Sequence, residues 1–126
     1  MAAITSEEHA RREIEQLVRS YCRALETLEA EQLKRIYPQV DVALQRELFR
    51  QYRSLKCTLA GPVEFARLDA SPTGGAQLKV AMRQEIRMRS GGAPKVVETI
   101  ATFVVSRMAN ESPWLIDRLQ VVAKPK

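Results

Sequence analysis

The chain has 126 residues but only one histidine and two cysteines, and this scarcity excludes several kinds of site. His9 cannot build a multi-histidine metal centre by itself, and it lies among charged residues near the N-terminus, where a buried catalytic base is not expected. Cys22 and Cys57 belong to no Cys-x-x-Cys pair, so their spacing indicates neither a zinc site nor a disulfide framework. We therefore expect two buried thiols, no metal and no cofactor.

The sequence also lacks any run of 18 apolar residues and any apolar segment of a signal peptide. We expect a cytoplasmic chain that does not cross a membrane. Its length fits a single domain over residues 1–126, with one core. The Met-Ala-Ala start is compatible with a natural N-terminus and equally with a domain cut from a larger protein.

Aromatic residues are few as well, at seven in the whole chain, while the net charge is +5. Four cations of the second half, Lys79, Arg83, Arg87 and Arg89, have the same parity and would lie on one face of a strand. Such a stripe could bind phosphate or carboxylate groups, but a solvated sheet face is the more common outcome. No aromatic residue interleaves the stripe to stack on bases, which argues against nucleic-acid binding.

The first 53 residues have the periodicity of helices. Thr5 and Glu8 have the spacing of a capping box, and one apolar stripe follows from Ile14 to Leu28. A short second helix over residues 31–37 should end at Pro38. Asp41 is a plausible cap of a third helix, whose expected buried side consists of Val42, Leu44, Leu48, Phe49 and Tyr52.

From Leu55 to about residue 123 the pattern is that of strands. Gly61-Pro62 interrupts the first run, which predicts a broken edge strand continuing over Val63 to Leu68. Residues 69–75 and 90–94 are rich in turn residues, and they bracket a half-buried strand over residues 77–89. Two more strands over residues 96–108 and 114–122 complete a meander, so the fold class is α+β, with helices over about 6–53 and a sheet over about 55–123.

The position of the turn decides which side chains of the long hairpin share a face of the sheet. If it closes about Gly92, even-numbered positions of both strands share the face that packs against the helices. The opposite face is then apolar among its cations, and we expect it to form a homodimer, unless the C-terminal strand or a bulge covers it. The residues proposed for this dimer face are Ala81, Arg83, Val97, Ala101, Phe103 and Val105.

Several segments together resemble the nuclear transport factor 2-like superfamily. They are the first helix over residues 14–25, the short helix over 32–37, the strand over 97–105, and Ser112-Pro-Trp-Leu-Ile-Asp-Arg118. The resemblance covers nearly the whole chain and implies helices packed in the concave face of a curved antiparallel sheet, a cone-shaped α+β barrel. The chain resembles a non-catalytic bacterial member, but this scaffold hosts isomerases, dehydratases and non-catalytic domains alike, so the function must be argued from the site.

The enzymes of that superfamily need residues that can be checked here. Tyr21 lies where ketosteroid isomerase-like members carry an oxyanion-stabilising tyrosine. Their general base is an aspartate on an early strand, but the corresponding segment, residues 38–48, looks helical, and Asp41 would cap it. Dehydratase-like members need an Asp and His pair inside the cone, and the single His lies at the wrong end. We therefore assign no catalytic residue.

Pocket candidates follow from the expected inner face. Glu98 would be an acid or a ligand anchor if it is buried there, although a position near the turn would let it reach water or an arginine. Gln84 and Thr102 could orient a ligand or bond to each other, and Tyr21 or Trp114 could be core or pocket wall. The full set is Tyr21, Phe49, Met82, Gln84, Glu98, Thr102 and Trp114.

The sequence thus favours a non-catalytic module that binds a small apolar or amphipathic ligand, dimerises, or does both. By resemblance, it could be an appendage of a larger bacterial signalling protein such as a Ser/Thr kinase. The alternative is a small isomerase, dehydratase or hydrolase acting on an apolar substrate, with Tyr21 and Glu98 as its functional pair. That alternative requires Glu98 to point into a closed cavity.

Overall fold

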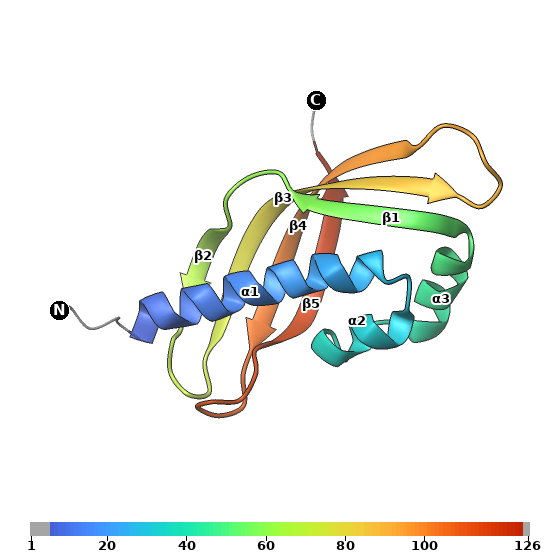
Figure 1. The fold of residues 1–126 in the computed structure, drawn as a ribbon. Helices are drawn as coiled ribbons and strands as arrows, with labels where there is room; N and C mark the ends of the chain where they lie inside the picture. Colours follow the sequence, from blue (N-terminus) through green and yellow to red (C-terminus); the bar gives the residue numbers. More distant parts are fainter. Residues whose placement is uncertain (1–5, 125–126) are drawn as a thin grey trace.

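The computed structural model describes residues 6–124, in which three helices precede five antiparallel strands (Figure 1). This order confirms the predicted α+β class. None of the helices in the described chain has the length and apolar character that a membrane span requires. The elements are α1 (Ser6–Glu26), α2 (Ala30–Ile36), α3 (Val42–Arg50), β1 (Tyr52–Leu59), β2 (Glu64–Leu68), β3 (Gly75–Met88), β4 (Lys95–Ser106) and β5 (Leu115–Ala123).

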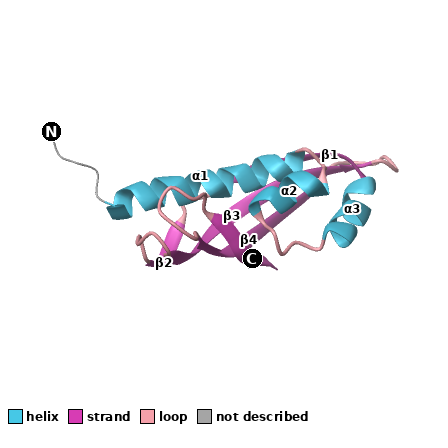
Figure 2. Cartoon of the chain, turned by 90° about the horizontal axis from the view of Figure 1, so that it is seen from below, coloured by secondary structure: helices cyan, strands magenta, loops and turns pink. Residues whose placement is uncertain are grey.

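Helix α1 crosses the concave side of the sheet and supplies much of the core (Figures 1 and 2). Its apolar stripe is buried as predicted, including Ile14, Val18 and Leu25. Each such aliphatic side chain stabilises the fold by about 2 kcal/mol relative to an exposed position. The helix ends in a turn in which Leu28 adopts a left-handed conformation, with φ of 57°. Thr5, the predicted capping residue, lies outside the described residues.

Helix α3 begins at the predicted cap, because an Asp41 side-chain oxygen accepts a hydrogen bond from the backbone N–H of Leu44 at 3.1 Å. The predicted buried side was wrong for three of its five residues, since Tyr52 lies outside α3 at the start of β1. Leu44 is 59% exposed and Leu48 is 39% exposed, whereas Phe49 is buried. The helix lies at the rim of the domain beside α2 and the start of β1 (Figure 1), so the body of the protein covers only a narrow strip of it.

The strands pair in the order β1-β3-β4-β5, and β2 also pairs with β3. Strands β1 and β2 therefore lie one after the other along the same edge of β3, as the registers Lys56↔Glu85 and Glu64↔Lys79 show. This confirms the predicted edge strand interrupted at Gly61-Pro62. Proline lacks a backbone N–H to donate, so it is tolerated at such a break but not inside a central strand.

The register of the β3–β4 hairpin differs from the prediction by three residues, because a hairpin closed about Gly92 would pair Met82 with Thr102. Met82 pairs with Thr99 and Leu78 with Phe103, so even-numbered positions of β3 share a face with odd-numbered positions of β4. Gly91 and Gly92 both have positive φ, and the turn is centred just before them and not on Gly92. A shift by an odd number of residues moves every side chain of a strand to the other face. The predicted inner face was therefore right for β3 and wrong for β4.

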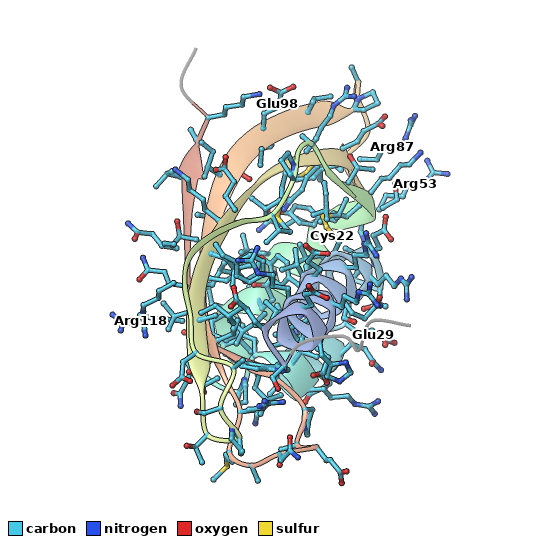
Figure 3. All side chains as sticks on the ribbon, turned by 90° about the vertical axis from the view of Figure 1, so that its left-hand side faces the viewer. Cys22, Glu29, Arg53, Arg87, Glu98 and Arg118 are labelled. Carbon is cyan, nitrogen blue, oxygen red and sulfur yellow. A yellow bond between two sulfur atoms is a disulfide. The ribbon has the colours of Figure 1, made fainter. Side chains whose placement is uncertain are left out.

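All three helices lie on one side of the curved sheet, and its other side carries no helix (Figures 2 and 3). The core fills the space between α1 and the sheet. Its most deeply buried side chains come from the helix and from both central strands, and they include Ile14, Leu33, Leu78, Met82, Phe103 and Ile116.

Candidate functional site

Four of the predicted pocket residues lie in the core but on different elements, with Tyr21 on α1, Phe49 on α3, Met82 on β3 and Trp114 just before β5. Tyr21, Phe49, Met82 and Trp114 are all buried. The Tyr21 ring meets the edge of Phe103, with 5.4 Å between ring centroids. Burial, with a smaller electrostatic contribution from Tyr37, raises the pKa of Tyr21 to about 12. At neutral pH the Tyr21 phenol is therefore protonated and can donate a hydrogen bond.

Glu98 and Thr102 are on the other face of the sheet, which corrects two of the pocket predictions. Glu98 is exposed and lies opposite Arg83 across the hairpin, and Figure 3 shows it at an end of the sheet away from the helices. Thr102 lies opposite Lys79. Both were misplaced by the error in register, and Glu98 does not point into the concave side as an acid or base would have to.

In the observed register, Thr99 faces the concave side of the sheet. It is only 7% exposed, and its hydroxyl oxygen has no hydrogen-bond partner among the described residues. Gln84 lies on the same face of the neighbouring strand, opposite Val97, so Gln84 and Thr99 are diagonal neighbours about 7 to 8 Å apart. Sequence reasoning missed Thr99 because the predicted parity of β4 placed it outside.

The inner-facing residues of the sheet around Thr99 are neutral. They are Val80, Met82 and Gln84 of β3 with Val97, Thr99, Ala101 and Phe103 of β4. Thr99 and Gln84 offer hydrogen bonds in apolar surroundings, but these residues include no carboxylate or imidazole to move a proton. The arrangement lacks the positioned base that proton abstraction requires.

Trp114 belongs to a separate cluster around Arg107, at the other end of α1. The Arg107 guanidinium lies 4.8 Å from the Trp114 ring centroid and donates hydrogen bonds to the backbone oxygens of Ala70 and Ser71 at 2.8 and 3.2 Å. It also lies 3.7 Å from a carboxylate oxygen of Glu13. Arg107 is 9% exposed, so this cluster fixes the β2–β3 loop to α1. Nothing in the sequence pattern pointed to it.

Phe49 lines an open hollow of about 450 Å³ between α3 and the turn after α1. Three arginines surround it, but each has a partner. Arg46 pairs with Glu31, Arg50 pairs with Glu47 at 2.7 Å, and Arg89 donates to the backbone oxygen of Tyr52 at 3.1 Å. The hollow is therefore less cationic than its arginine content suggests.

Cys22 and Cys57 form a disulfide that joins α1 to β1, with 5.3 Å between their Cα atoms. The prediction of two free thiols was wrong, because sequence spacing does not reveal that α1 crosses β1 at this point. A carboxylate oxygen of Glu26 accepts a hydrogen bond from the backbone N–H of Cys57 at 3.0 Å and ties the same two elements together. Within residues 6–124, no three His, Cys, Asp or Glu side chains are grouped closely enough to hold a metal ion.

The outer sheet face differs from the predicted dimer face in most of its residues. Ala81 and Arg83 do lie there, but Ala101, Phe103 and Val105 are in the core and Val97 faces inward. All four cations of the predicted stripe, Lys79, Arg83, Arg87 and Arg89, are exposed. Lys79 lies opposite Glu64, and Arg83 lies opposite Glu98. Acidic neighbours therefore offset much of the positive charge on this face.

No protein-family model and no curated protein matches the sequence. Solved structures do match. A protein from Novosphingobium aromaticivorans, provisionally described as a scytalone dehydratase, is 10% identical over 95% of this chain and 87% of its own, with a TM-score of 0.77. A nuclear transport factor 2-like superfamily protein from Salmonella enterica is 11% identical over 91% of both chains, with a TM-score of 0.73.

A third structure, from Xanthomonas campestris, carries the provisional description of a calcium/calmodulin dependent protein kinase II association domain. It is 19% identical over 99% of this chain and 94% of its own, with a TM-score of 0.71. These likenesses define the class of scaffold. The chain has the cone fold of the nuclear transport factor 2-like superfamily, with three N-terminal helices and a five-stranded antiparallel sheet.

Proposed function

We propose that the chain is a non-catalytic module that binds a small, neutral, largely apolar ligand on the concave face and dimerises through the outer face of the sheet. One observation carries the ligand proposal. The buried Thr99 hydroxyl has no partner among the described residues and lies in neutral, apolar surroundings beside Gln84. A buried polar group without a partner is costly, and a ligand hydroxyl or carbonyl would relieve that cost.

The position of Glu98 also favours binding over catalysis. The enzymatic alternative needed Glu98 as its acid or base, and its side chain is exposed on the outer face. The Tyr21 phenol could still polarise a carbonyl, but without a base it would only orient the ligand. The fold is shared by proteins provisionally described as an enzyme and as an association domain, so the fold itself favours neither function.

A matched pair of probes tests the ligand proposal. Naphthol and naphthalene differ by one hydroxyl, and we expect naphthol to bind more tightly by about 5-fold, the effect of one hydrogen bond to a buried group. Thr99→Val should remove this preference, whereas Thr102→Val on the outer face should preserve it. Titrations followed by calorimetry measure both affinities. Absence of binding by either probe, or a preference that survives in Thr99→Val, would contradict the proposal.

The proposed dimer rests on an apolar row that crosses three strands of the outer face. Ala81 pairs with Ile100, which pairs with Val122, and Val122 is about half exposed. Charged pairs such as Arg83 and Glu98 lie beside this row and would form a polar rim. The likeness to an association domain supports self-association, and it also supports our proposal that the chain is an appendage of a larger bacterial signalling protein such as a kinase.

Sedimentation velocity tests the dimer directly. Ile100→Glu places a charge in the centre of the row and should convert dimers to monomers, whereas Arg87→Glu, on an exposed residue of β3 outside the row, should not. If the wild-type chain sediments as a monomer at all concentrations, the dimer proposal fails.

The disulfide bears on localisation. Disulfides persist in oxidising compartments and are rare in the reducing cytoplasm. We propose that the chain functions where the Cys22–Cys57 bond is stable, which the cytoplasmic expectation from the sequence did not consider. Alkylation of free thiols in intact cells before lysis tests this, because a protein that is alkylated at both cysteines in its native setting contradicts it.

A further inference from the structure

The Cys22–Cys57 disulfide forms part of the wall of a second open hollow, also of about 450 Å³. The hollow lies between the last turns of α1 and the end of β1, and Figure 3 shows Cys22 where the helix meets the sheet. Both cysteines are largely buried, at 6 and 7% exposure. The hollow is therefore the direction from which a reagent could approach, and its volume suits a small molecule but not a protein. The other residues that line it are Arg19, Arg23, Glu26, Leu59 and Gly61.

Two exposed arginines flank the disulfide on the helix. Arg19 and Arg23 lie three residues before and one residue after Cys22, and neither forms an ion pair among residues 6–124. The one acidic residue of the hollow, Glu26, already accepts a hydrogen bond from the backbone of Cys57. The hollow thus places two unpaired guanidinium groups beside a disulfide, and guanidinium groups bind carboxylates well.

We propose that this hollow is a thiol–disulfide exchange site for a small thiol that carries carboxylates, such as glutathione. The arginines would hold the carboxylates and raise the local concentration of the thiolate at the disulfide. Exchange at this place would break the covalent link between α1 and β1, two elements that are otherwise joined here by packing and by the Glu26 hydrogen bond. The redox state of the thiol would thereby control how firmly β1 is held to the helix.

The chemistry balances without another oxidant or reductant. The incoming thiolate attacks one cysteine sulfur, the Cys22–Cys57 bond breaks, and its electron pair leaves on the other sulfur, which takes up a proton. A second thiolate then attacks the mixed disulfide, which releases the oxidised thiol as its own disulfide and leaves two protein thiols. The reverse sequence, starting from the disulfide form of the same thiol, restores the link.

Three thiols of different charge test the proposal on the intact chain. Glutathione is anionic, mercaptoethanol is neutral and cysteamine is cationic, and the rate at which each reduces the protein is followed by alkylation and mass spectrometry. Each rate is divided by the rate with the same thiol on the urea-unfolded protein, which removes differences in intrinsic reactivity. We expect the normalised rate for glutathione to exceed that for cysteamine by about 10-fold at low salt, and the difference to shrink as salt is added.

Variants show whether the two arginines cause this selectivity. Arg19→Ala combined with Arg23→Ala should lower the glutathione rate by about 5-fold and leave the mercaptoethanol rate unchanged. Arg12→Ala is the matched control, because Arg12 is also exposed on α1 but lies roughly 15 Å away along the helix axis. With Cys22→Ser and oxidised glutathione, the free Cys57 thiolate should attack the glutathione disulfide, form a mixed disulfide with one glutathione and release the other as a thiol.

Three results would overturn the proposal. The first is a double arginine variant that slows all three thiols equally. The second is an equal effect of Arg12→Ala. The third is reduction that occurs only at the rate of global unfolding, because the disulfide would then be an inaccessible structural link.

Discussion

Removing the Cys22–Cys57 disulfide should destabilise the fold by an amount that can be calculated from the chain. The two residues are 35 positions apart, and closing a loop of that length in the unfolded chain corresponds to about 4 kcal/mol at room temperature in the chain-entropy description. We expect the double variant Cys22→Ala with Cys57→Ala to lose about 2 to 4 kcal/mol, because measured effects often fall below the entropic value.

Urea unfolding measures this loss, and thermal unfolding gives an independent value. For a chain of 126 residues, 1 kcal/mol corresponds to a change of about 4 °C in Tm, so the midpoint should fall by about 8 to 15 °C. The slope of the urea dependence should change little if the effect is on stability alone. The wild-type protein in the presence of a reductant should unfold at nearly the same urea concentration as the double variant.

The single variants show whether the disulfide link or the packing of two separate thiols stabilises the fold. Cys22→Ala and Cys57→Ala each remove the same link, so each should lose nearly as much as the double variant, within about 1 kcal/mol for the packing of one buried sulfur. If the single effects instead add up to the double effect, the two cysteines contribute independently as packed thiols. The same conclusion would follow if reductant left the wild-type midpoint unchanged.

Three further predictions concern named side chains. The pKa of Tyr21 is raised from 10.0 to about 12 in the folded state, so its stabilising contribution should be complete below pH 10 and be lost as the pH rises towards 12. Urea unfolding at a series of pH values should show this decline in stability, and Tyr21→Phe should weaken it. A decline that is unchanged in Tyr21→Phe would contradict the assignment. Arg107→Ala should cost about 3 kcal/mol by urea unfolding and speed hydrogen exchange in the 69–75 loop, because two backbone oxygens lose their donor and Glu13 loses its arginine neighbour. Arg107→Lys should cost less, and a loss in the alanine variant below about 1 kcal/mol would refute this role. Asp41→Ala should cost about 1 kcal/mol in thermal unfolding through loss of the helix cap, while Asp41→Asn should stay near the wild type. Equal losses in both variants would exclude capping as the cause.

The elements of this fold were predictable where the signal is local. The stripe from Ile14 to Leu25 fixed which face of α1 is buried, because helical periodicity depends only on neighbouring residues. The Asp41 cap and the interruption at Gly61-Pro62 were likewise found, since each follows from the side-chain or backbone chemistry of one or two residues. The exposure of Leu44 was not predicted, because it depends on what α3 packs against.

The candidate site was harder to predict because it depends on one turn. The centre of the 90–94 turn decides whether Glu98 and Thr102, or Thr99, faces the helices, and alternation alone fits either register. The error in register therefore gave a pocket with an acid and a dimer face that included Phe103. The correct register gives a neutral concave face and places Phe103 in the core.

The sequence by itself determined the class of fold, the order of its elements and the buried faces of α1 and β3, because periodicity, caps and turn residues act over short distances along the chain. Only the tertiary structure decided the pairing of Cys22 with Cys57, the Arg107 cluster and the burial of Thr99. Each of these joins residues that are distant in sequence. Their contact depends on how α1 crosses the sheet and on the register of β4, and both are set by the packing of the whole domain.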